Sequence, residues 1–93
     1  MAADKLMHDL VEFYGTECHF CNVMQPLLEK LHNEEGLKVQ KVECWHNEDN
    51  ARLFEETDQG RCGGVPFFLN RKTGKWICGA TNYEKFKAWA LGK

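Results

Sequence analysis

The chain has 93 residues, of which 43% are hydrophobic and 12% aromatic, so it is long enough for one domain with a real core and too apolar to be disordered. Its formal net charge of -2 provides no basic surface and argues against nucleic acid as a partner. No apolar run approaches a membrane span, and the charged N-terminal segment predicts no secretory signal. We therefore expect a single domain over residues 1–93.

The cysteine count bears on the redox compartment. Five cysteines cannot all pair internally, and the composition does not indicate a fold that needs disulfide staples. We therefore expect one functional pair and three spare thiols in a reducing compartment, most simply the cytoplasm. The mature form of an organellar protein, trimmed of its transit peptide, would look the same.

Apolar periodicity and turn residues divide the chain into strands and helices, without repeats or linkers. Pro26 lies inside the first helix, where a proline removes a backbone hydrogen bond and should kink the helix. Thr81 and Glu84 have the spacing of a capping box, which opens the last helix at Thr81. In chain order we expect a strand at 9–14, a helix at 18–33, a strand at 38–44, a helix at 47–60, strands at 65–69 and 75–78, and the last helix.

The order of these elements predicts an α/β fold. The strand–helix–strand unit implies a right-handed crossover and parallel pairing of the first two strands. The short loop at 70–74, with a glycine near its end, joins the last two strands as a hairpin and forces antiparallel pairing. We expect a four-stranded mixed sheet with helices on both of its faces.

The run Cys18-His19-Phe20-Cys21 separates the first strand from the first helix. Three residues of helix rise only about 4.5 Å, which is within the Cα separation of about 4.4–6.8 Å that a disulfide tolerates. Unpaired N–H groups at the helix N-terminus favour thiolate over thiol. The spacing predicts a redox-active dithiol. The alternatives are two inert core thiols or half of a zinc site, although no second close cysteine pair is present to complete one.

The two cysteines have different expected roles. Cys18 is the expected nucleophile because it lies nearer to the helix end and to solvent. Cys21, one turn further in, is the expected resolving thiol, which attacks the mixed disulfide. His19 would add positive charge beside the thiolate when protonated, or would simply face solvent without consequence.

Glu12 lies in the middle of an apolar strand. Simple alternation would turn it outward on a half-exposed strand. A first strand covered by helices on both faces would instead bury it, and burial raises the pKa of a carboxyl group. A carboxyl group that titrates near neutrality behind Cys21 would move the proton that thiol–disulfide exchange requires.

From about Asp9 to Leu91 the chain resembles the thioredoxin superfamily. In this resemblance Lys41 is the lysine near the buried acid, and Glu12 takes the place of the family aspartate. Pro66 is the proline whose peptide bond is cis and faces the dithiol, although base rates alone would favour trans. The matching positions are Val11-Glu12-Phe13-Tyr14 for the family Val-Asp-Phe-Trp, Pro26 for the kinking proline, Lys41, Val65-Pro66, and Gly79-Ala80 before the last helix.

Two departures leave the subfamily open. The thioredoxin signature Trp-Cys-Gly-Pro-Cys is replaced by Glu17-Cys18-His19-Phe20-Cys21, and an aromatic residue before the second cysteine resembles glutaredoxins. However, the run 79–82 does not match the Gly-Gly, small residue and acid with which glutaredoxins hold glutathione.

The resemblance implies a monomeric thiol–disulfide oxidoreductase that acts on protein disulfides and needs no metal or organic cofactor. Its electrons would come from a reductase or from glutathione. Val65 would pair with an extended substrate strand beside Pro66, and His19 and Phe20 would also contact substrate. The alternatives are a glutathione-dependent glutaredoxin-like reductase, a non-catalytic adaptor, or a dimer that bridges an iron–sulfur cluster through Cys18.

The other three cysteines have no partner that the sequence identifies. Cys62, between Arg61 and two glycines, is expected to be a spare surface thiol close to Pro66, with a regulatory disulfide or a mixed adduct as the alternative. Cys44 and Cys78 fall in predicted strands and are expected to be small core residues.

Overall fold

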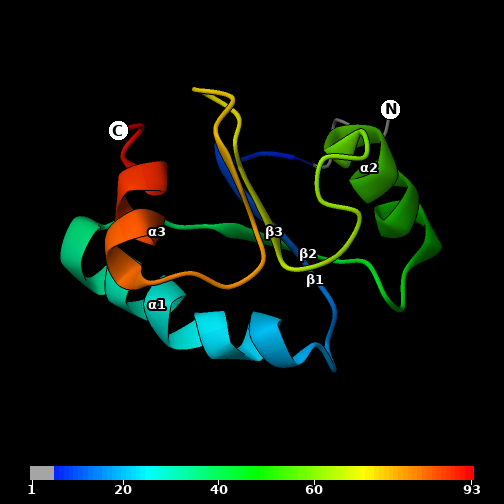
Figure 1. Cartoon of the computed structure of the whole chain (residues 1–93), viewed down its shortest axis with the longest axis horizontal. Coiled ribbons are helices and arrows are strands. Elements are labelled where there is room, and N and C mark those ends of the chain that lie inside the picture. The colour runs from blue at the N-terminus through cyan, green and yellow to red at the C-terminus, as the bar shows by residue number, and fades with distance from the viewer. Residues whose placement is uncertain (1–5) are drawn as a thin grey trace.

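The computed structural model describes residues 6–93 as an α/β fold (Figure 1). Residues 1–5, which belong to the predicted domain and to the segment inspected for a secretory signal, lie outside the described residues. From residue 6 onward, no helix is both long enough and apolar enough to cross a membrane. The elements are β1 (Leu10–Tyr14), α1 (His19–Glu35), β2 (Gln40–Glu43), α2 (Glu48–Asp58), β3 (Phe67–Asn70), β4 (Trp76–Cys78) and α3 (Tyr83–Ala90).

The strands form one mixed sheet in the order β2-β1-β3-β4. β1 pairs parallel with β2 and antiparallel with β3, and β3 pairs antiparallel with β4. The predicted sheet is therefore confirmed. β2 is shorter than the predicted strand because it is an edge strand whose only ladder runs beside β1, from Gln40 to Glu43.

β1 is the central strand, and its alternating side chains enter two separate cores. α1 and α3 cover one face of the sheet and α2 covers the other (Figure 1). Leu10 packs under α1 and α3, whereas Val11 and Phe13 pack under α2. Since side chains two residues apart share a face of a strand, Glu12 lies on the face of Leu10, beneath α1.

Aromatic rings fix α3 on the sheet. The ring centroids of Phe68 and Phe86 are 5.1 Å apart, those of Phe68 and Trp89 5.6 Å, and those of Phe86 and Trp89 5.3 Å. Each such pair contributes about 0.5–1.5 kcal/mol beyond the area it buries. The three rings therefore hold the last helix over β3.

The helix ends carry recognisable caps. Cys18 is the N-cap of α1, and Gly36 ends that helix in the left-handed conformation at φ 68°. α1 continues through Pro26 as one element, and its predicted kink stays a prediction. The cap of α3 is Asn82, whose side chain accepts from the backbone N–H of Lys85, so the prediction of Thr81 as cap is wrong. The backbone N–H of Thr81 instead donates to Sδ of Met24.

The cysteine predictions need correction. Cys62 and Cys78 form a disulfide with a Cα separation of 5.4 Å, so Cys62 is not a spare thiol. Cys78 is exposed rather than a core residue, and it ends β4, an edge strand of the sheet. Cys44 is buried as predicted, and it is the free cysteine among residues 6–93.

Asn70 joins the β3–β4 turn to the end of α3. Its side-chain amide is buried and donates to the carbonyl oxygen of Trp89 at 3.0 Å, while its Oδ1 accepts from the backbone N–H of Lys72 at 3.0 Å. The amide thus both donates and accepts, so the attachment of the β3–β4 turn to the end of α3 requires an uncharged side chain that carries a donor.

We expect Asn70→Asp to lower the free energy of unfolding by about 2–3 kcal/mol. The substitution removes the donor to Trp89 and places a carboxylate against its carbonyl oxygen. Urea denaturation at pH 7 measures the change, with Asn33→Asp, at an exposed helical position, as the matched control. Equal stability of the two variants would show that the Asn70 bonds contribute nothing.

Candidate active site

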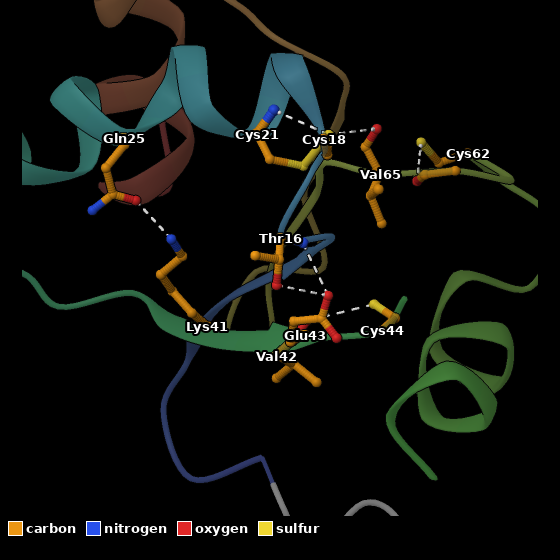
Figure 2. Close-up of a disulfide and its surroundings, with 11 residues drawn as sticks. Thr16, Cys18, Cys21, Gln25, Lys41, Val42, Glu43, Cys44, Cys62 and Val65 are labelled. Atoms are coloured by element: carbon orange, nitrogen blue, oxygen red, sulfur yellow. Dashed lines mark hydrogen bonds between the residues drawn. A yellow bond between two sulfur atoms is a disulfide. The ribbon is translucent and has the colours of Figure 1, made fainter. Parts of the chain in front are cut away.

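The predicted dithiol is present as a disulfide between Cys18 and Cys21, with a Cα separation of 5.2 Å (Figure 2). Cys18 is in the extended conformation at φ -73° and ψ 116°, and its Sγ accepts from the backbone N–H of Cys21 at 3.1 Å. That N–H belongs to the first turn of α1, where backbone donors have no helical partner. After reduction, the same donor stabilises a thiolate on Cys18.

Cys18 was expected to lie nearer to solvent than Cys21, but the structure buries both residues. Cys18 is 5% exposed and Cys21 is 3% exposed. The two residues between them face outward: His19 is exposed, and Phe20 is 58% exposed, with ring centroids 5.2 Å apart. Two exposed rings therefore lie between the two cysteines in the sequence.

The Val65–Pro66 peptide bond is cis, as the resemblance implied. The carbonyl oxygen of Val65 lies 3.8 Å from Sγ of Cys18 (Figure 2). β3 begins one residue after Pro66, whose own carbonyl accepts from the backbone N–H of Gly79 at 2.8 Å. The structure thus places Val65 directly beside Cys18 and just outside the sheet ladder.

Glu12 is buried, with no exposed surface. Neither carboxyl oxygen has a hydrogen-bond partner among residues 6–93. Burial raises the pKa of Glu12 from 4.5 to about 7, and the charge of Lys41 opposes that rise. Cys21 lies on the buried face of α1, together with Met24 and Leu28, and this face covers the side of β1 that carries Glu12.

Lys41 lies next to Glu12 in the parallel register of β1 and β2, but its hydrogen bond goes elsewhere. Its Nζ donates to Oε1 of Gln25 on α1 at 2.6 Å (Figure 2). The same Nζ lies 4.3 Å from the centre of the Tyr14 ring. Lys41 therefore acts on Glu12 through its charge while it links β2 to α1.

A hydrogen-bonded network that the sequence analysis missed holds the loop before Cys18, residues 15–17, which we term the active-site loop. The Glu43 carboxylate accepts from the backbone N–H of Thr16 at 2.9 Å and from its hydroxyl at 3.1 Å. It also accepts from the backbone N–H of His46 at 2.8 Å, and the His46 ring contacts the Glu17 carboxylate at 2.7 Å. Glu17 in place of the family tryptophan was the one sequence signal for this network.

The Glu17–His46 contact also affects charge. Its hydrogen bond lowers the pKa of Glu17 and raises the pKa of His46. Both side chains are exposed, so solvent screens the pair.

Trp45, next to His46, packs on Gly15, where an added Cβ would lie 2.1 Å from the indole ring. Gly15 is therefore required for the approach of Trp45 to the active-site loop.

A groove of about 400 Å³ lies between α2 and the loop that ends at Val65. Trp45 and Phe54 form apolar walls, and Gly63, Gly64 and Val65 form the opposite side. The groove therefore extends to Val65, whose carbonyl oxygen lies beside Sγ of Cys18. No group of three or more His, Cys, Asp or Glu residues within residues 6–93 is arranged to hold a metal ion.

Comparison with known families and structures agrees with this geometry. The sequence model of the thioredoxin family matches residues 2–89. The glutaredoxin of Archaeoglobus fulgidus is a similar solved structure, with a TM-score of 0.68, 18% identity, and coverage of 91% of this chain and 88% of that chain. The oxidised mitochondrial thioredoxin 3 of Saccharomyces cerevisiae has a TM-score of 0.58, 24% identity, and coverage of 94% and 81%. No curated protein matches the sequence.

The raised pKa of Glu12 makes stability depend on pH. The folded state keeps this proton between about pH 4.5 and 7, where the unfolded chain has lost it, so stability falls as pH rises through that window. We expect Glu12→Gln, which cannot ionise, to be more stable than the unsubstituted protein by about 3 kcal/mol at pH 8, with the difference vanishing near pH 4.

Urea denaturation at the two pH values measures this effect. Glu29→Gln is the matched control, because Glu29 is exposed on α1 and should show no such pH dependence. A constant stability difference between pH 4 and pH 8 for Glu12→Gln would contradict an ionisation that burial opposes.

Proposed function

The chain belongs to the thioredoxin family, and from that membership we propose that it reduces or exchanges protein disulfides through Cys18 and Cys21. The observation that carries the proposal is the Cys18–Cys21 pair at the start of α1, with Val65 beside it. A cysteine pair in this position is the arrangement of thiol–disulfide oxidoreductases in general.

In the first step, the thiolate of Cys18 attacks one sulfur of the substrate disulfide. A mixed disulfide forms, and the other substrate sulfur leaves as a thiolate that takes up a proton. The backbone N–H of Cys21, 3.1 Å from Sγ of Cys18, stabilises the attacking thiolate. Because that donor is already in place, the thiolate needs no rearrangement of the helix.

In the second step, the Cys21 thiolate attacks Sγ of Cys18 and releases the reduced substrate. Cys21 must lose a proton first, and Glu12 is the proposed acceptor. A carboxyl group with a pKa of about 7 exchanges a proton readily at neutral pH. Lys41 limits the rise of that pKa by its charge, which is its proposed role. The enzyme ends with a Cys18–Cys21 disulfide, and two electrons have passed to the substrate.

Substrate binding is proposed to use Val65 and the groove beside it. An extended substrate segment would lie along Val65, next to Pro66, and place its disulfide over Cys18. The apolar walls of the groove would accept a neighbouring substrate side chain, while His19 and Phe20 contact the segment from α1. No metal or organic cofactor takes part in these steps.

The proposed setting is a monomer in a reducing compartment such as the cytoplasm, because a reductant must regenerate the dithiol after each turnover. A thioredoxin reductase is the proposed electron donor. The alternative donor is glutathione, which the aromatic Phe20 before the second cysteine favours. Against glutathione stands the segment before α3, where the Asn82 side chain already caps the helix.

We expect Cys18→Ser to abolish insulin reduction and Cys21→Ser to trap a mixed disulfide with the substrate, because only Cys18 starts the exchange. Non-reducing electrophoresis and mass spectrometry detect the trapped species. Cys44→Ser is the matched control, since Cys44 is buried and forms no disulfide. Trapping through Cys21 in the Cys18→Ser variant would reverse the assigned roles.

Two measurements decide between the donors and the binding alternatives. We expect turnover with a thioredoxin reductase to exceed turnover with glutathione and glutathione reductase by about tenfold or more, which corresponds to at least about 1.4 kcal/mol in the transition state. Faster turnover with glutathione would establish the glutaredoxin-like alternative.

We also expect a colourless protein after anaerobic purification, whereas a visible absorption band lost in Cys18→Ser would indicate an iron–sulfur cluster.

A further inference from the structure

The second disulfide, between Cys62 and Cys78, attaches the segment that carries Val65 to strand β4. Cys62 lies in the loop between α2 and β3, and we term residues 59–65 of it the Val65 loop. Cys78 ends β4, where it pairs in register with Phe67. The disulfide therefore connects the chain before Pro66 to the strand that pairs just after it. Figure 2 shows Cys62 and Val65 on the same stretch of chain, next to the Cys18–Cys21 pair.

The other attachments of the Val65 loop are non-covalent, and Cys62 and Val65 also pack against the core under α2. The buried carboxylate of Asp58 accepts from the backbone N–H groups of Cys62 and Gly63, each at 2.7 Å. The Arg61 guanidinium donates to the carbonyl oxygens of Thr57 and Asp58. These hydrogen bonds hold the start of the loop at the end of α2. The Arg61 guanidinium also lies 5.7 Å from the centres of the Phe67 and Trp76 rings, and the disulfide adds a covalent attachment to the sheet.

Two glycines follow the disulfide and lead directly to Val65. Gly63 has a φ of 74°, and neither Gly63 nor Gly64 has any atom within 4 Å of the position of a Cβ. Glycines are the most flexible residues of a chain, so the stretch between Cys62 and Val65 has little stiffness of its own. The position of Val65 therefore depends on the anchored residues on either side of it.

The two sulfurs differ in access. Cys78 is exposed on an edge strand, whereas Cys62 is half-buried against the core under α2. A thiolate from solution thus reaches Cys78 more easily than Cys62, and thiol–disulfide exchange begins at the sulfur that is accessible.

We propose that Cys62 and Cys78 form a second redox site, a disulfide that a dithiol opens at Cys78 and that holds the Val65 loop in its substrate-accepting position while closed. The part that concerns substrate rests on the proposed function of Cys18 and Cys21. The redox reaction and its effect on the loop do not.

The reaction has two balanced steps. A thiolate of the dithiol attacks Sγ of Cys78, which forms a mixed disulfide and expels the Cys62 thiolate, and that thiolate takes up a proton. The second thiol of the dithiol then displaces Cys78 and leaves as part of a new disulfide. Cys62 and Cys78 end as two thiols, and the dithiol has lost two electrons and two protons.

The first test removes the active-site dithiol with the double substitution Cys18→Ser and Cys21→Ser. This variant is equilibrated with mixtures of reduced and oxidised dithiothreitol, quenched with acid and alkylated after denaturation. We expect Cys44 alone to be alkylated at the oxidising end, with Cys62 and Cys78 alkylated together as the mixture becomes reducing. The second part treats separate portions of the same equilibrated mixtures, still folded and not quenched, briefly with trypsin, which cuts after Arg61 inside the Val65 loop.

We expect reduction to speed cleavage after Arg61 by about tenfold, because the loop loses its covalent attachment to β4. Cleavage after Arg52, in the middle of α2, is the internal control and should change by less than about twofold. Unchanged cleavage after Arg61, or equal acceleration at Arg61 and Arg52, would overturn the proposal, since the disulfide would then control no loop or only global stability.

The substrate part is tested with the double substitution Cys62→Ser and Cys78→Ser. We expect the KM for insulin to rise about three- to tenfold with kcat unchanged, because a loosened loop must be ordered on binding. Turnover of a small aromatic disulfide, which does not need the loop, should be unchanged. An unchanged KM for insulin would overturn the substrate part. Absence of insulin reduction in the unsubstituted protein would instead contradict the proposed function, and the trypsin result would still stand.

Discussion

The burial of Leu10 to Phe13 in β1 is the constraint on which the rest of this structure depends. The strand is paired along both edges and covered by helices on both faces, so the side chains of residues 10–13 are all buried. Leu10, Val11 and Phe13 gain free energy from that burial, whereas Glu12 loses the hydration of its carboxylate. The fold therefore holds beneath α1 a carboxyl group whose pKa is about 7. Its burial costs stability, and the burial of the apolar residues of the same strand offsets that cost.

The same strand sets the position of the cysteines. β1 ends at Tyr14, and the chain turns through the active-site loop into the first turn of α1. The buried residues of α1 (Cys21, Met24, Leu28 and Leu31) recur at helical spacing, so packing of this face on the sheet turns Cys21 inward. Cys18, at the cap, stays at the helix end beside Val65. Packing thus places Cys21 on the buried face of α1 and Cys18 at the helix end, although both residues are buried.

Local patterns were sufficient to predict most of this arrangement. The hydrophobic periodicity of the strands and helices predicted the sheet. Burial of Glu12 was one of two alternatives, the one expected if helices cover both faces of its strand, and the structure has it buried. The resemblance supplied the cis peptide at Pro66. The pairing of Cys62 with Cys78 could not be predicted, because the two are 16 residues apart and meet only through the register of β3 and β4. The choice of Asn82 over Thr81 as cap shows the same limit, since both residue types cap helices well.

The two loops that flank Cys18 are held by the same chemical device on different elements. Glu43, at the end of β2, accepts backbone N–H groups from Thr16 and His46, and Asp58, at the end of α2, accepts them from Cys62 and Gly63. Carboxylate acceptors for backbone N–H groups are strong because the acceptor is charged. On the α2 side a covalent bond that can be reduced is added, whereas on the β2 side the addition is an exposed Glu17–His46 pair that depends on pH. In the proposed second redox site, reduction of Cys62–Cys78 would therefore act on the Val65 loop, whereas the Glu43 hydrogen bonds of the active-site loop contain no bond that can be reduced.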